Sequence, residues 1–221
     1  MPRDLIVWQL CDSAFPAGAL AHSNGLEAAW QAGEVVGTDG LDLWARANLG
    51  QAAAAAVPLA SAAWSEPDAL PTLDAWYDAF LLNHVANRAS RVQGQAFLMA
   101  CERAFDTQPI QRVAAVVREG RLAAHWALVL GATGRALGLS RRQTCRLLLF
   151  LSLRGAVSSA VRLGIVGPLE GQKLQHRLAV TLNDLVRRHV GTPVESVAQT
   201  APLVDLLQGT QDRLYSRLFI S

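Results

Sequence analysis

The chain has 221 residues, of which 51% are hydrophobic and 17% charged, and its formal net charge is +2. A chain of this length buries enough surface to fold without a disulfide or a metal ion, and its near-neutral charge argues against nucleic acid as a partner. Ala and Leu dominate the apolar residues, whereas β-branched and aromatic residues are comparatively few, which favours helices over strands.

Helical patterns begin near the start of the chain, and we find neither strand alternation nor an internal repeat. We expect a short helix over residues 5–11, followed by a turn that contains Pro16 and Gly18. Ser23 or Asn24 can cap the helix that comes next.

A longer helix should follow, with proline interrupting it. Thr38 and Asp39 open this helix, and Pro58 should kink or restart it. Pro67 and Pro71 then bracket a loop. Further helices are predicted over residues 72–84, with Thr72 as the cap, and over residues 88–105, 109–119 and 121–137.

The second half begins with the most apolar helix of the chain. Ser140 should cap a helix that reaches about residue 166, and Gly167-Pro168 should end it and start the helix over residues 169–190. A linker over residues 191–193 and a last helix over residues 202–215 complete the pattern. About ten helices with short connections predict an all-α bundle, with residues 1–221 as one domain and residues 208–221 as a tail.

Two features bear on where the protein works. The apolar run over residues 147–166 contains Arg154 and Arg162, and such charges are costly at bilayer depth, so we interpret it as a buried helix and expect no membrane association. The N-terminus lacks the apolar core of a signal peptide, and the cysteines Cys11, Cys101 and Cys145 are far apart. These observations favour a reducing, cytoplasmic location with free thiols.

Charge is distributed unevenly between the two halves. Residues 1–110 hold 5 Arg against 12 Asp and Glu, whereas residues 111–221 hold 15 Lys and Arg against 6 Asp and Glu. Either the halves neutralise each other in the fold, or a basic surface faces an acidic partner.

No known catalytic motif is recognisable in the sequence. The five histidines are scattered, without the spacing of a helical metal pair. Asp74 and Asp78 are four residues apart and so lie on one side of a helix, which fits either an exposed acidic face or an acid–base pair. We therefore expect no cofactor and no metal site.

Two segments are unusual for a plain helical core. FPAGALAHSNGLE, residues 15–27, is apolar but contains a proline, two glycines and one histidine. QDRLYSRLFIS, residues 211–221, combines two arginines with aromatic and aliphatic side chains, as interface hot spots do.

Together these segments resemble the urease accessory protein UreF family. The first is similar to a motif near the start of that family, and SRLFIS is similar to the SRLFRS with which its members typically end. NRASRVQGQAFLMA, residues 87–100, and RLGIVGPLEGQKLQ, residues 162–175, resemble two middle segments. Ile220 stands where the family commonly has Arg, and His22 where it often has Tyr.

The resemblance implies an all-helical, non-enzymatic chaperone that is commonly a homodimer. It implies binding to UreD/UreH and to the GTPase UreG during nickel insertion into apo-urease, with nickel and GTP belonging to the partners. It places UreG at the N-terminal motif and the tail arginine, for which His22 and Arg217 are the matching positions, and UreD/UreH at the tail. The implied partner-binding residues are Phe15, Pro16, Gly18, His22, Ser23, Gly25, Glu27, Arg88, Arg91, Arg213, Tyr215, Arg217, Leu218 and Phe219.

Within the motif, Pro16 and Gly18 should make a rigid turn, and Gly25 should let a neighbour approach closely. His22 and Ser23 should face a partner, although Ser23 serves equally well as a helix cap. An arginine finger for the GTPase could be Arg217, Arg88 or Arg91, and the sequence does not select among them.

Three alternatives stay open on the sequence alone. One is an all-helical enzyme that uses His22 with Asp12 or Glu27, and another is a nickel carrier that uses His22 or Cys11. The third is a nucleic-acid binder that uses the arginine-rich second half.

Overall fold

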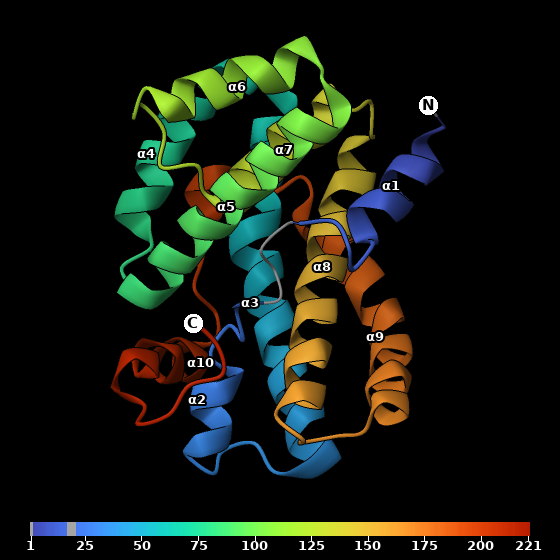
Figure 1. The fold of residues 1–221 in the computed structure, drawn as a ribbon, viewed down its shortest axis with the longest axis vertical. Coiled ribbons are helices and arrows are strands. Elements are labelled where there is room, and N and C mark those ends of the chain that lie inside the picture. The colour runs from blue at the N-terminus through green and yellow to red at the C-terminus, as the bar shows by residue number, and fades with distance from the viewer. Residues whose placement is uncertain (1, 17–20) are drawn as a thin grey trace.

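The fold is all-helical throughout residues 2–16 and 21–221, the part of the chain that the computed structural model describes (Figure 1). Its ten α-helices are α1 (Arg3–Cys11), α2 (Leu26–Gln31), α3 (Gly37–Ser65), α4 (Leu70–Phe80), α5 (His84–Phe105), α6 (Gln108–Arg118), α7 (Trp126–Ala136), α8 (Arg141–Arg162), α9 (Pro168–His189) and α10 (Pro202–Gly209). Short 3-10 turns cover Pro67–Ala69 (η2), Val194–Ser196 (η3) and Gln211–Arg213 (η4). The prediction of an all-α bundle with about ten helices is confirmed.

Helix α8 lies at the centre, packed against α3, α7 and α9. Its start is as predicted, because Ser140 Oγ accepts a hydrogen bond from Gln143 N (3.2 Å) and Gln143 Oε1 accepts one from Ser140 N (2.9 Å). By length and composition α8 could cross a membrane, but 67% of its most apolar window is buried inside the structure. Such burial is typical of a core helix, as we expected for the apolar run over residues 147–166.

Helix α3 continues through Pro58 and reaches Ser65, so the predicted restart at this proline is wrong. Proline removes one hydrogen bond from a helix interior. Pro58 and both its neighbours, Val57 and Leu59, are buried where α3 packs on α7 and α8. Tertiary packing of this kind supplies most of a helix's stability and outweighs one lost bond.

Several predicted helix ends are also wrong. Thr72 lies inside α4, and Asn83 instead caps α5, because its Oδ1 accepts hydrogen bonds from Val85 N (3.0 Å) and Ala86 N (3.2 Å). The N-cap position of α2 is Gly25, with a φ of 88°, and not Ser23 or Asn24, although Ser23 Oγ accepts a long hydrogen bond from Glu27 N (3.4 Å) in the first turn. The last helix ends at Gly209 and gives way to η4, short of residue 215.

The predicted helix over residues 121–137 begins only at Trp126. The Asp74 carboxylate from α4 accepts hydrogen bonds from the backbone N–H groups of Ala123 (2.5 Å), Ala124 (3.1 Å) and His125 (2.9 Å). This interaction holds Ala124 at a φ of 65°, outside the helical region. Asp74 is buried, so its reading as part of an exposed acidic face is also wrong.

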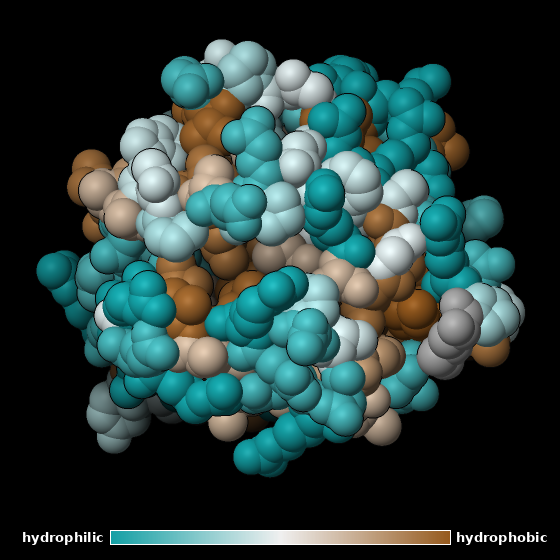
Figure 2. All heavy atoms as spheres, turned by 90° about the horizontal axis from the view of Figure 1, so that it is seen from above, coloured by the Kyte–Doolittle hydropathy of each residue, from teal (hydrophilic) through white to brown (hydrophobic). Residues whose placement is uncertain are grey.

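Opposite charges from the two halves of the chain meet in the fold. Ion pairs join Asp42 to Arg177 (3.1 Å), Glu102 to Arg118 (2.8 Å) and Arg88 to Asp212 (2.8 Å). Seen from above, hydrophilic side chains cover most of the surface and hydrophobic ones show through in separate patches (Figure 2). The halves therefore neutralise each other in part.

Candidate functional site

The N-terminal motif and the tail lie against each other near the C-terminus, beside α2 and α10 (Figure 1). Ile220 N donates to Ala21 O (2.9 Å), and Ser23 donates to Ser221 O through its backbone N–H (2.5 Å) and its hydroxyl (2.9 Å). His22 Nδ1 and Ser221 Oγ form a further hydrogen bond of 2.7 Å. We call residues 21–27 and 211–221 together the clasp.

A buried carboxylate anchors the clasp. Glu27 is 2% exposed, and no ion pair to it occurs among the described residues. Its Oε1 accepts a hydrogen bond from Leu218 N (2.6 Å), and its Oε2 accepts from Phe219 N (3.1 Å) and Gln211 Nε2 (2.7 Å). Backbone N–H groups thus replace a cation as the partners of this charge.

The tail packs against the motif within this chain, and it buries Gln211, Phe219 and Ser221 while most of its other side chains are exposed. Phe219 is buried, and the Arg162 guanidinium lies 4.4 Å from the centroid of its ring. Tyr215 is fully exposed and Leu218 about half exposed. Glu27 and the motif hold these tail residues by hydrogen bonds within this chain.

The other motif residues differ in their surroundings. Phe15 is half-buried and packs near Phe97, with ring centroids 6.0 Å apart, whereas Pro16 is exposed. Gly18 falls outside the described residues. A Cβ on Gly25 would lie 2.9 Å from Gln208 Cβ, which confirms the predicted close approach of a neighbour.

His22 is buried, with 3% exposure, so within this chain it faces Ser221 and not a partner as the sequence suggested. Ser23 is buried in the same way. Burial lowers the pKa of His22, and the nearby Arg88 charge lowers it further. Within residues 2–16 and 21–221, His22 bonds to neither Asp12 nor Glu27, so the pairing that the enzyme alternative requires does not form. No group of three or more His, Cys, Asp or Glu in these residues could hold a metal ion.

A cluster of cations surrounds one exposed carboxylate next to the clasp. Arg88 forms a bidentate pair with Asp212 (3.0 and 2.8 Å), and Arg217 (3.2 Å) and His84 (3.4 Å) contact the same carboxylate. We call these four residues the Asp212 cluster. The arginine hydrogen bonds hold the pKa of Asp212 below its usual range. Arg91 lies nearby on α5 and pairs with Asp78 at 3.8 Å, and Arg213 is exposed on η4.

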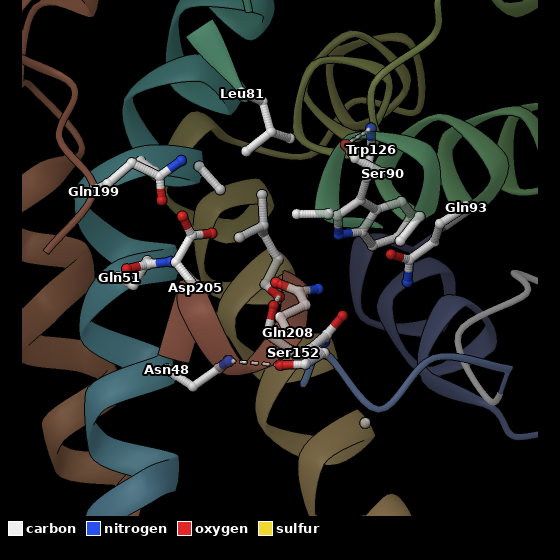
Figure 3. Close-up of a pocket in the computed structure, with 18 of the residues that line it drawn as sticks. Asn48, Gln51, Leu81, Ser90, Gln93, Trp126, Ser152, Gln199, Asp205 and Gln208 are labelled. Atoms are coloured by element: carbon white, nitrogen blue, oxygen red, sulfur yellow. Dashed lines mark hydrogen bonds between the residues drawn. The ribbon is translucent and has the colours of Figure 1, made fainter. Parts of the chain in front are cut away.

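Helix α10 exposes two leucines and turns polar side chains toward a pocket. Leu203 and Leu206 are 73% and 67% exposed, whereas Val204 is buried in the core. Asp205 and Gln208 face a pocket of about 150 Å³ that also contacts α3, α5 and α8 (Figure 3).

The pocket is lined by polar and apolar side chains in similar number. Asn48 and Gln51 enter it from α3, Gln93 from α5 and Ser152 from α8 (Figure 3). The inner face of α10 therefore covers this partly polar space, while Val204 and Leu207 pack against the hydrophobic core.

Sequence reasoning missed the partners that build this site. Gln211, Asp212 and Ser221 were part of the quoted tail but were given no role, and His84 was placed at the end of the wrong helix.

Comparisons with known proteins agree on one family. A family model described as UreF matches residues 35–179. Urease accessory protein F of Arabidopsis thaliana is 34% identical over 221 residues, covering 97% of this chain and 91% of that protein. Urease accessory protein F of Oryza sativa subsp. indica is 34% identical, covering 96% and 83%, and urease accessory protein UreF of Arthrobacter sp. (strain FB24) is 28% identical, covering 98% and 96%.

Proposed function

Because the chain belongs to the UreF family of urease accessory proteins, we propose that it is a non-enzymatic scaffold for urease maturation. In this proposal it bridges UreD/UreH and the GTPase UreG while nickel is inserted into apo-urease, in the cytoplasm and as a homodimer. Nickel is cargo and GTP belongs to UreG, so the chain itself carries no cofactor.

The outer face of α10 and the tail is the observation that carries this proposal. Leu203 and Leu206 are exposed on α10, and Tyr215 is exposed on the tail that the clasp holds in place. Exposed aliphatic and aromatic side chains on ordered backbone are typical of protein interfaces and bind with little loss of entropy. We assign this face to UreD/UreH, in line with the resemblance of the tail.

We assign UreG to the neighbouring exposed arginines. Arg88, Arg91 and Arg217 are all accessible at their charged ends. His22 is buried, so in this proposal it acts indirectly, by holding Ser221 and thereby the tail, and does not contact UreG itself. Through these arginines the chain modulates GTP hydrolysis by UreG.

Size-exclusion chromatography of the chain with its cognate UreD/UreH and UreG tests the proposal. Deleting the tail is unsuitable because it removes buried Phe219. We therefore use the double variant Leu203→Ser and Leu206→Ser, with Leu169→Ser and Val180→Ser on α9 as the control, since those residues are 77% and 70% exposed.

We expect the α10 variant to lose UreD/UreH and the α9 variant to keep it. Retention of the complex by both variants would refute the assignment of this face, and no complex with the unmodified chain would refute the scaffold. In a second assay, the chain should change the rate of GTP hydrolysis by UreG, and Arg217→Ala should reduce that change.

A further inference from the structure

The Asp212 cluster is an arginine site that the chain's own carboxylate occupies. The planar fork of Arg88 meets both oxygens of Asp212, and Arg217 and His84 approach the same two oxygens. Bidentate arginine pairing of this kind recognises carboxylates by shape as well as charge. The geometry of a carboxylate receptor is therefore already formed.

Positive charge exceeds negative charge at this place. In residues 2–16 and 21–221, the ion pairs of Arg88, Arg91 and Arg217 involve two carboxylates, Asp212 and Asp78, and His84 adds a further charge when it is protonated. Asp78 is also engaged elsewhere, because it accepts hydrogen bonds from Asn87 Nδ2 (3.0 Å) and His125 Nε2 (3.0 Å).

An open groove of about 640 Å³ runs along α5 beside the cluster. Its lining includes Asp78, Leu82, His84, Arg88, Arg91 and Gln95. Leu82 is 89% exposed and Val92 is 47% exposed. A groove with arginines and exposed apolar side chains can accept a peptide chain, which brings both kinds of group, better than it can accept a bare inorganic anion.

Asp212 can leave the cluster without releasing the tail. Its side chain is one-third exposed, and exposed ion pairs contribute little to stability because solvent screens them. The residue before it, Gln211, fixes the tail separately by buried hydrogen bonds, because its Nε2 donates to Glu27 and to Phe219 O (3.3 Å). Exchange of one carboxylate for another therefore costs little.

We propose that the Asp212 cluster docks an acidic segment of a partner protein, whose carboxylate replaces Asp212 between Arg88 and Arg217. Asp212 is then a placeholder that keeps the two arginines in binding geometry until the partner arrives, which lowers the ordering cost of docking. The inference rests on the proposed function, because it assigns the chemistry of a partner at the same face.

A fluorescein-labelled hexaglutamate peptide is the probe, and its binding is followed by fluorescence anisotropy at low ionic strength. We expect Asp212→Asn to tighten binding about two- to fivefold, since it removes the competing charge. We expect Arg88→Gln to weaken binding at least fivefold. Asp184→Asn is the control, because Asp184 also pairs with an arginine, is similarly exposed and changes the net charge equally; it should leave the affinity within twofold.

Unchanged or weaker binding by Asp212→Asn would overturn the proposal, since Asp212 would then be only a structural partner. Equal tightening by Asp184→Asn would overturn it too, because net charge alone would explain the result. Inorganic phosphate that displaces the peptide at lower concentration than free glutamate would identify a phosphate site instead. The peptide assay needs no urease protein, so it can succeed or fail independently of the scaffold proposal.

Discussion

Replacing Glu27 by Gln should detach the tail while leaving the bundle folded. The carboxylate accepts three hydrogen bonds, one on Oε1 from Leu218 N and two on Oε2 from Phe219 N and Gln211 Nε2. A carboxamide has one accepting oxygen and one donating nitrogen. If the oxygen keeps the two donors, the nitrogen of Gln must face Leu218 N, donor against donor.

The magnitude follows from that mismatch. A hydrogen bond to a charged group contributes about 1.5–3 kcal/mol, and the two bonds that remain lose their charge assistance. The docked tail should therefore lose about 2–4 kcal/mol, which raises the undocked fraction roughly 30- to 1,000-fold. The three hydrogen bonds that this carboxylate accepts all come from the tail, so the unfolding of the bundle itself should change much less.

Hydrogen exchange measured by mass spectrometry on residues 211–221 tests this prediction. In Glu27→Gln the exchange of the Leu218 and Phe219 amides should accelerate, while peptides from α8 keep their protection. Glu34→Gln is the control, because Glu34 is exposed and close in sequence. Tail protection that survives Glu27→Gln would show that the buried carboxylate does not anchor the clasp.

The remaining predictions concern packing, helix capping and pH. Gly94→Ala should lower the free energy of unfolding in urea by about 1–3 kcal/mol, because its Cβ would overlap Ala124 O. Gly155→Ala places its Cβ in open space and should raise that free energy by up to about 1 kcal/mol. Equal effects of the two substitutions would contradict the packing argument. Asn83→Asp keeps an oxygen that can cap α5, but it places a second carboxylate next to Asp205 Oδ1, and the two repel each other. Hydrogen exchange of the backbone amides should therefore become faster in α10 and stay unchanged at the start of α5. Burial lowers the pKa values of His22 and His125, so below about pH 6.5 the unfolded chain binds more protons and stability should fall between pH 7 and pH 5; urea titrations that show no fall would refute this.

The sequence predicted the fold well where local signals decide the structure. The Ser140 cap and the Gly167-Pro168 break mark the ends of α8 and the start of α9, and both signals act within a few residues. The sequence-based prediction failed where a side chain distant in the sequence determines the local structure. Nothing between residues 121 and 125 indicates that Asp74, about fifty residues earlier, takes their N–H groups and delays α7.

The candidate site was predicted as two segments but not as one structure. Their composition singled out residues 15–27 and 211–221, yet composition does not say which polar atoms meet. The hydrogen bonds between Glu27 and the tail N–H groups depend on backbone geometry, which no residue pattern encodes. The same holds for Asp212, an ordinary acidic residue in the sequence that the fold places between two arginines.

The clasp also sets the order in which this chain can fold as it is made. His22 and Ser221 are 199 residues apart, so the side chains of His22 and Ser23 lack their Ser221 partner until residue 221 has left the ribosome. At a synthesis rate of about 5–20 residues per second, that delay is on the order of 10–40 s. Bundle helices such as α3 and α8 can pair earlier, whereas residues 21–27 must wait, and during that wait a ribosome-associated chaperone would find them open.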